Sequence, residues 1–289
     1  MRDALVIGGG AAGLSGALLL ARSRRSTLVI DAGEPRNAPA AAVHGLLARD
    51  GTPPAELLAA GRDEVRRYGG EIRRGVVTSA KAADGGFVVT TSDGATERAR
   101  RLLVASGGID VLPPIPGLAE RWGVDVIHCP YCHGWEVRDQ AIGILAAGAM
   151  SVHQALLFRQ LSEDVVFFGP PAPELAERGI RVVTEPVVAV ESSGDRLTGV
   201  RLKDGTLFPR EALAVSTRLK VRLPDGLGLT VEENAMGERV PSEMGGRTSV
   251  PGVWVAGNIT DPSAPLGSAA AAGAMAGAMI NADLVMAGV

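Results

Sequence analysis

Short apolar runs, each followed by glycine or a turn residue, recur along the chain and predict buried strands. Residues 4–7 read Ala-Leu-Val-Ile and residues 27–30 read Thr-Leu-Val-Ile, while the stretch 14–21 between them has the length of a helix. Strands that are buried on both faces show such continuous apolar runs rather than strict alternation. The order strand, helix, strand therefore predicts an α/β domain at the N-terminus.

Similar runs follow further along the chain. Further elements are predicted as strands at 102–105, 142–145, 165–168 and 253–255, a helix at 152–161, and a helix of small residues from about Gly267. We expect this last helix to pack closely on a flat surface. Asn281 and Asp283 interrupt it, and it is too weakly hydrophobic to predict a membrane span.

Length and charge narrow the class of protein. The chain of 289 residues is long enough for two domains. Its formal net charge of −3 is spread over the chain, and no basic patch with interleaved aromatic residues predicts nucleic-acid binding. The apolar N-terminus contains many glycines, which favours a strand and turn over a signal peptide. Only two cysteines are present, so we expect a cytoplasmic protein.

The first glycine cluster predicts a dinucleotide site. Gly8, Gly10 and Gly13 follow the first strand and open the first helix, and Asp31 ends the second strand. In this arrangement the glycines allow a tight turn, the approach of a pyrophosphate and close helix packing, while the acidic residue binds the adenosine ribose. The alternative is a glycine turn with a purely structural role.

The two cysteines, Cys129 and Cys132, are separated by two residues and predict a redox-active disulfide. Half of a zinc site is the alternative, but no second cysteine pair would complete it, and we expect no metal. His133 follows directly and could exchange a proton with an incoming thiol. His44, His128 and His153 are expected to be structural, although one of them could line a cofactor pocket.

Two later segments extend the pattern. Residues 102–108 and 253–258 are strands that run into glycine turns, and together with the first motif they resemble the flavin motifs of two-domain pyridine nucleotide-disulfide oxidoreductases. The chain resembles low-molecular-weight thioredoxin reductase over nearly its whole length. The resemblance implies an α/β fold of two Rossmann-like, doubly wound, three-layer domains. An FAD domain (1–115 and 219–289) is interrupted by a smaller, degenerate NADPH-like domain (116–218).

The same resemblance implies which residues hold FAD. They are Gly8, Gly10, Ala11, Ala12, Gly13, Asp31, Ala32, Arg36, Asn37, His44, Ala105, Ser106, Gly107, Gly257, Asn258, Ser268 and Ala269. Thioredoxin reductases usually carry Asp at the position of Asn258, and an asparagine can still hydrogen-bond a ribityl hydroxyl.

The inserted domain departs from that family. Its strand at 142–145 leads into Ala146 and Ala147, where an NADPH fingerprint has glycines, and the added β-carbons would stand where a pyrophosphate must touch the backbone. The strand at 165–168 leads into a proline-rich segment with no arginine before Arg178, although an NADP site needs a cation. We therefore expect no NADPH binding.

The run Cys-Pro-Tyr-Cys-His-Gly-Trp-Glu beside a lost NADPH site resembles a narrower family, the thioredoxin-reductase-like dithiol oxidases that close disulfides in microbial natural products such as holomycin, gliotoxin and romidepsin. The resemblance implies a homodimer with FAD that serves antibiotic biosynthesis or self-protection. A small-molecule dithiol would be oxidised through Cys129, Cys132 and His133, with O2 as terminal acceptor and H2O2 as product. The alternatives are an NADPH- or ferredoxin-dependent disulfide reductase and a non-catalytic flavin redox sensor.

Overall fold

The structure is a computed structural model that describes residues 1–288 and divides into two compact units. Unit 1 contains Met1–Ala38, Leu46–Ile109 and the chain from Leu219, and unit 2 contains Pro39–Gly45 and Asp110–Arg218. The predicted first boundary, between residues 115 and 116, therefore falls inside unit 2. The predicted last segment ends at Val289, which lies outside the described residues.

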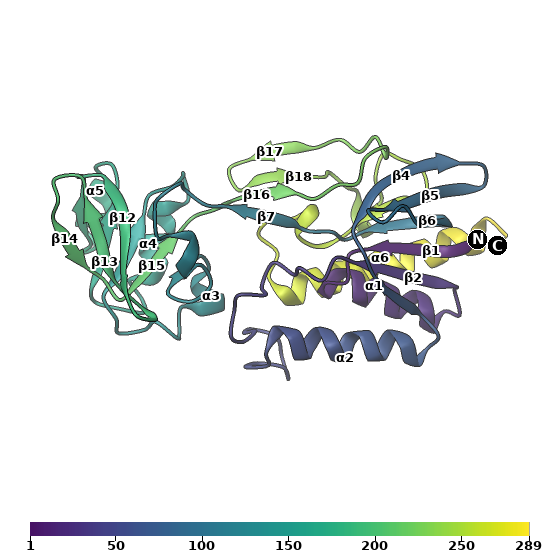
Figure 1. Cartoon of the computed structure of the whole chain (residues 1–289), viewed down its shortest axis with the longest axis horizontal. Helices are drawn as coiled ribbons and strands as arrows, with labels where there is room; N and C mark the ends of the chain where they lie inside the picture. The colour runs from purple at the N-terminus through teal and green to yellow at the C-terminus, as the bar shows by residue number, and fades with distance from the viewer. Residues whose placement is uncertain (289) are drawn as a thin grey trace. The chain divides into compact units, whose positions relative to one another are not determined.

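Unit 1 is built on a seven-stranded sheet in the order β3-β2-β1-β6-β5-β4, with β19 also paired to β6, and on a four-stranded sheet in the order β17-β18-β16-β7 (Figure 1). The strands are β1 (Arg2–Ile7), β2 (Thr27–Asp31), β3 (Glu71–Arg74), β4 (Val77–Ala83), β5 (Gly86–Thr91), β6 (Thr96–Val104), β7 (Gly108–Val111), β16 (Arg218–Val221), β17 (Glu232–Asn234), β18 (Gly237–Arg239) and β19 (Val253–Val255). The helices are α1 (Ala11–Arg22), α2 (Pro54–Arg67) and α6 (Leu266–Met286), with short 3₁₀ turns η2 (Met244–Gly246) and η3 (Gly257–Ile259).

Alternate residues of β1 serve two different cores. Ala4 and Val6 join the buried cluster formed with α1, α2 and α6, whereas Leu5 and Ile7 join a cluster on the opposite face of the sheet. Successive side chains of a strand point to opposite faces, so a strand covered on both sides must be apolar throughout. This explains the continuous apolar run that the sequence shows.

The long C-terminal helix α6 packs backbone to backbone against α1. A β-carbon at Gly273 would overlap the carbonyl group of Ala12, and one at Gly277 would lie 2.5 Å from the carbonyl oxygen of Gly16. By length and composition α6 could cross a membrane, but its glycines lie against α1, and we interpret it as a helix that packs on unit 1 along one face. The surface that it packs on most closely is thus a helix rather than the predicted flat one.

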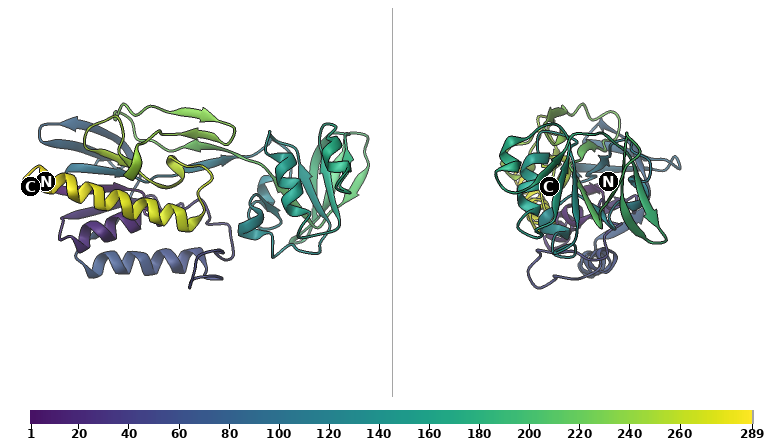
Figure 2. Two further views of the ribbon diagram at one scale, coloured as in Figure 1. Left: turned by 180° about the vertical axis from the view of Figure 1, so that it is seen from behind. Right: turned by 90° about the vertical axis from the view of Figure 1, so that its left-hand side faces the viewer.

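Unit 2 repeats the layering of unit 1 on a smaller scale. Its sheet is parallel, in the order β11-β10-β9-β15-β8, with helices on one face and a three-stranded antiparallel sheet, β12-β13-β14, on the other (Figure 2). The elements are η1 (Ala119–Arg121), β8 (Val126–Ile127), α3 (Pro130–His133), β9 (Ile142–Leu145), α4 (Ser151–Phe158), β10 (Val165–Phe168), α5 (Pro173–Ala176), β11 (Arg181–Val183), β12 (Val187–Ser193), β13 (Arg196–Leu202), β14 (Leu207–Pro209) and β15 (Ala212–Val215).

The sequence predicted some of the strands and helices, namely those that correspond to β1, β2, β6, β9, β10, β19, α1, α4 and α6. The strand–helix–strand at 142–168 is observed as β9, α4 and β10, although α4 ends at Phe158 rather than at residue 161. The segment 39–45 was not predicted to leave unit 1, because nothing in its local pattern indicates which core it joins. The predicted α/β fold with two Rossmann-type domains is confirmed.

The contact between α6 and α1 predicts a stability difference within one helix. Gly273→Ala would force the two helices apart, and such overpacking costs about 1–3 kcal/mol. We expect a thermal midpoint several degrees lower in a calorimetric scan. The matched control is Gly267→Ala, whose β-carbon would meet only the Leu46 side chain at 3.7 Å. Equal midpoints for the two variants would contradict this account of the helix packing.

Candidate redox site and cofactor cradle

Three turns of unit 1 meet at the carboxyl ends of its parallel strands. Ile7 lies in register with Val104, and Val104 with Val255, so the residues after β1, β6 and β19 come together. A β-carbon at Gly8 would collide with the carbonyl of Ala105, which follows β6. One at Gly257 would lie 2.9 Å from the Ala12 side chain and 3.9 Å from that of Ala269. The first, second and third predicted flavin motifs therefore form one edge.

The glycine turn leaves the start of α1 open. Gly13 lies directly on the carbonyl oxygen of Gly8, whereas nothing lies within 4 Å of a β-carbon built at Gly10. The first turn of α1 has neither a side-chain cap nor an acidic residue. Its backbone N–H groups and the positive end of the helix dipole are thus suited to an anion.

Asp31 is fixed at the same edge. Its Oδ1 atom accepts a hydrogen bond from the Gly9 N–H at 3.0 Å, and this bond holds the carboxylate at the end of β2. Together with the open start of α1, these residues fit the ADP half of FAD: the pyrophosphate would bind near Gly10, and the ribose hydroxyls would meet Asp31.

Two side chains hold the loop 261–265 beside this edge. Asn258 donates both of its amide hydrogens, to the carbonyl oxygens of Asp261 at 3.1 Å and Ala264 at 3.0 Å, and Arg36 donates to that of Pro262 at 3.1 Å. The remaining predicted cofactor residues lie around the same turns: Ala32 and Asn37 after β2, Ser106 and Gly107 after β6, Ala11 at the start of α1, and Ser268 in the first turn of α6.

The two cysteines form a disulfide at the carboxyl edge of the unit 2 sheet. Cys129 follows β8 and precedes the single turn α3, and its carbonyl accepts hydrogen bonds from the backbone N–H of Cys132 at 3.2 Å and of His133 at 3.1 Å. The turn brings the two α-carbons to 5.2 Å, a normal separation for a disulfide. The predicted redox pair is therefore closed in this structure.

His133 is the titratable side chain adjacent to this disulfide. Its Nε2 atom is buried and has no hydrogen-bond partner among the described residues. Burial lowers the pKa of its imidazole below 6.5, the carboxylate of Glu136 raises that pKa, and His44 lowers it. The ring is therefore neutral at pH 7 and able to accept a proton.

The other predicted histidines have different settings. His44 lies in the segment 39–45 of unit 2, with its Nε2 atom 3.3 Å from Glu136 Oε1. Its assignment to FAD stays a prediction. The Nδ1 atom of His128 lies 3.1 Å from the Val215 carbonyl oxygen, and His153 is exposed on α4.

The second glycine-type turn, after β9, is filled by a side chain. The N–H groups of Ala147 and Gly148 donate to Ser151 Oγ at 3.1 and 3.3 Å, and Ser151 is only 1% exposed. A β-carbon at Gly169, after the next strand, would overlap the methyl group of Ala146. The backbone groups that would bind a pyrophosphate here are thus already hydrogen-bonded within the chain.

Sequence reasoning missed two of these residues. Ser151 lies one residue before the predicted helix and was assigned no role, and Glu136 was noted only as part of the sequence motif. Its spacing of three residues from His133 was the available signal, because residues three apart in a helical turn lie on one side. The contact of Glu136 with His44 could not be found in this way, because the two residues lie far apart in the sequence.

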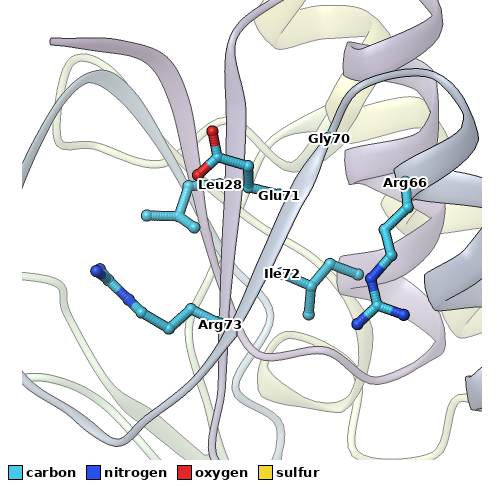
Figure 3. Close-up of a pocket in the computed structure, with 6 residues that line it drawn as sticks. All are labelled: Leu28, Arg66, Gly70, Glu71, Ile72 and Arg73. Atoms are coloured by element: carbon cyan, nitrogen blue, oxygen red, sulfur yellow. The ribbon is translucent and has the colours of Figure 1, made fainter.

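A hollow of about 310 Å³ lies at the edge strand β3, lined by Leu28, Arg66, Gly70, Glu71, Ile72 and Arg73 (Figure 3). Its charged groups have partners: Glu71 pairs with Arg2 at 2.5 Å, and Arg73 with Glu97 at 3.0 Å. None of the predicted site residues lines it, and we assign it no role.

Comparisons with known proteins agree with this geometry. Residues 2–170 match the model of the family described as pyridine nucleotide-disulphide oxidoreductase. Thioredoxin reductase tcpT of Claviceps purpurea is 34% identical over 98% of this chain and 94% of its own length.

Solved structures extend the likeness to the whole fold. The crystal structure of HlmI is 42% identical and superposes with a TM-score of 0.90, covering 98% of this chain and 92% of that one. An oxidoreductase from Agrobacterium tumefaciens is 37% identical with a TM-score of 0.91, covering 99% of both chains. With its open glycine cradle and its cysteine pair, this chain belongs to the pyridine nucleotide-disulphide oxidoreductase family, whose two-domain, thioredoxin-reductase-type fold it shares.

Proposed function

We propose that this oxidoreductase oxidises a small-molecule dithiol to an intramolecular disulfide. One observation carries the proposal: unit 2 keeps the Cys129–Cys132 disulfide with a neutral histidine beside it, while its dinucleotide turn is filled by Ser151. The cysteine pair, together with backbone N–H groups that are already hydrogen-bonded to Ser151, supports the entry of electrons from the dithiol rather than from a nicotinamide.

The chain's residues would divide the work as follows. The neutral Nε2 of His133 accepts a proton from one substrate thiol, and the thiolate attacks the Cys129 sulfur, which displaces Cys132 as a thiolate. The second substrate thiol then attacks its own partner sulfur, releases Cys129 and closes the product disulfide. The substrate loses two electrons and two protons, and the cysteine pair gains them.

The Gly8–Gly13 turn would hold FAD, and a bound flavin would supply a two-electron acceptor for the reduced cysteine pair, with O2 as the terminal acceptor and H2O2 as the product. In this chain Gly10 and the first turn of α1 would bind its pyrophosphate, and Asp31 would hold its ribose. The proposal includes a homodimer in the cytoplasm, with a compact dithiol from natural-product biosynthesis or self-protection as its substrate. These expectations derive from the resemblance to dithiol oxidases.

A disulfide reductase is the second candidate, and the relative named thioredoxin reductase favours it. It would require NADPH or another donor to reduce the flavin, with electrons flowing in the opposite direction through the same cysteines. The hydroxyl of Ser151 argues against NADPH, because a pyrophosphate would have to replace it as the acceptor of two backbone N–H groups.

Anaerobic mixing separates the two candidates. We expect a small dithiol such as reduced holomycin to bleach the visible flavin band, NADPH to leave it unchanged, and air to restore the colour with one H2O2 per dithiol. The readouts are stopped-flow absorbance and a peroxide assay. Prompt bleaching by NADPH would instead make the protein a reductase.

Removal of either sulfur tests the cysteine route. We expect Cys132→Ser and Cys129→Ser to reduce aerobic dithiol oxidation to background, because neither can complete the two-electron exchange. Bound flavin, measured by its absorbance, should be unchanged, since the cradle belongs to unit 1. Full activity in Cys132→Ser would show that the dithiol reduces the flavin by another route.

His133 predicts an acidic limb in the pH profile. Its pKa is lowered by burial, so the neutral, proton-accepting form persists at pH 7 and is lost only at a pH below 6.5. We expect kcat/KM to fall in that acidic range, and His133→Gln to lower it by about 10²–10⁴-fold at pH 7 and to abolish the limb. An unchanged limb in His133→Gln would assign it to another group.

A further inference from the structure

Residues 39–45 lie between two parts of unit 1 in the sequence, but they pack in unit 2, which also contains the disulfide. In the segment 39–45, Pro39 packs directly on Gly123, which has a φ of +82° and space for no side chain, and Val43 is only 5% exposed. The same segment places His44 Nε2 at 3.3 Å from Glu136 Oε1. Its position is therefore held by apolar packing and by an ion pair.

Glu136 and His44 shift the pKa of His133 in opposite directions. Glu136 follows His133 by three residues and stabilises a positive charge on the imidazole, whereas His44 opposes that charge. Because the His44 and Glu136 side chains are also paired with each other, each moderates the effect of the other on His133. The arrangement joins three residues from two distant parts of the sequence around one buried nitrogen.

The remaining ionisable groups nearby are engaged elsewhere. Arg138 stacks on Trp135 at 4.1 Å, Arg159 donates to the Ser162 carbonyl, and the His128 ring lies on the Val215 carbonyl. His153 lies on α4, which packs against α3, and its side chain is exposed. Next to His133, a β-carbon at Gly134 would meet the apolar side chain of Leu161. Among residues 1–288, the charged groups that shift the pKa of His133 are Glu136, which raises it, and His44, which lowers it.

We propose that His44 and Glu136 are positioning residues that set the protonation state of His133 beside the Cys129–Cys132 disulfide. The catalytic role of these residues rests on the proposed dithiol oxidation, whereas the contact between them is observed whatever the activity is. A purely stabilising role explains the pair less well, because Glu136 is 41% exposed and exposed ion pairs contribute at most about 1 kcal/mol. His44 acts from the loop 39–45, so this loop tunes the proton acceptor of the site.

This arrangement would assist the transfer of a proton from the substrate thiol to His133. When His133 takes a proton from a substrate thiol it becomes positive, and the Glu136 carboxylate stabilises that form. His44 lowers the pKa of His133 and so opposes the carboxylate, which keeps the ring neutral before substrate arrives. His133 then passes the proton to one of the cysteine thiolates, which becomes a thiol, and the imidazole returns to its neutral state.

The test is the titration of His133 in the oxidised protein, followed by NMR with histidine-selective labelling. Only four histidines are present, and His133→Gln assigns the signal. We expect Glu136→Gln to move the pKa of His133 down and His44→Ala to move it up, with the acidic limb of kcat/KM moving in the same directions. His44→Gln, which keeps an N–H donor for Glu136, should shift it upward less than His44→Ala.

The control is His153→Ala, an exposed histidine on α4, which should leave the His133 titration unchanged. Shifts of the same sign in Glu136→Gln and His44→Ala, or no shift in either, would overturn the proposal. The titration needs no substrate, so it decides the role of His44 and Glu136 even if the wild-type protein oxidises no dithiol. That last result would count against the proposed function alone.

Discussion

Direct contact between the backbones of α1 and α6 is the constraint on which the cofactor edge depends. With glycine at positions 273 and 277, no side chain separates the two helices, and the start of α1 is held against the turn that follows β19. The Ala12 and Ala269 side chains then lie close to Gly257, where an added β-carbon would be 2.9 and 3.9 Å from them. The cradle is thus closed by packing between the first and last parts of the chain.

The two units use one layered plan but differ at the turn where a dinucleotide would bind. In unit 1 the space at Gly10 is open and the first turn of α1 has no side-chain cap. In unit 2 the space at Gly148 is open as well and α4 has no side-chain cap, but the Ser151 hydroxyl accepts the hydrogen bonds of two backbone N–H groups. The two turns therefore differ in whether the backbone N–H groups already have an acceptor from the chain itself.

The sequence predicted those features that depend on interactions within a few residues of each other. The apolar runs of β1 and β2, the glycines after them and the cysteine spacing are each fixed by sheet burial, backbone conformation or ring closure within a few residues. The position of His44 depends on how Pro39 packs against Gly123, which lies far along the chain, and no periodicity records that contact. Long-range side-chain pairing is therefore what the sequence alone could not supply.

The amide of Asn258 has a consequence for how this family can diversify. Both of its hydrogens are donated to carbonyl oxygens of the loop 261–265, so an aspartate in its place would bring a carboxylate against two acceptors with no hydrogen to offer either. A member of the family with aspartate at this position would therefore need a different conformation of the loop, because the two carbonyl oxygens would lose their donor.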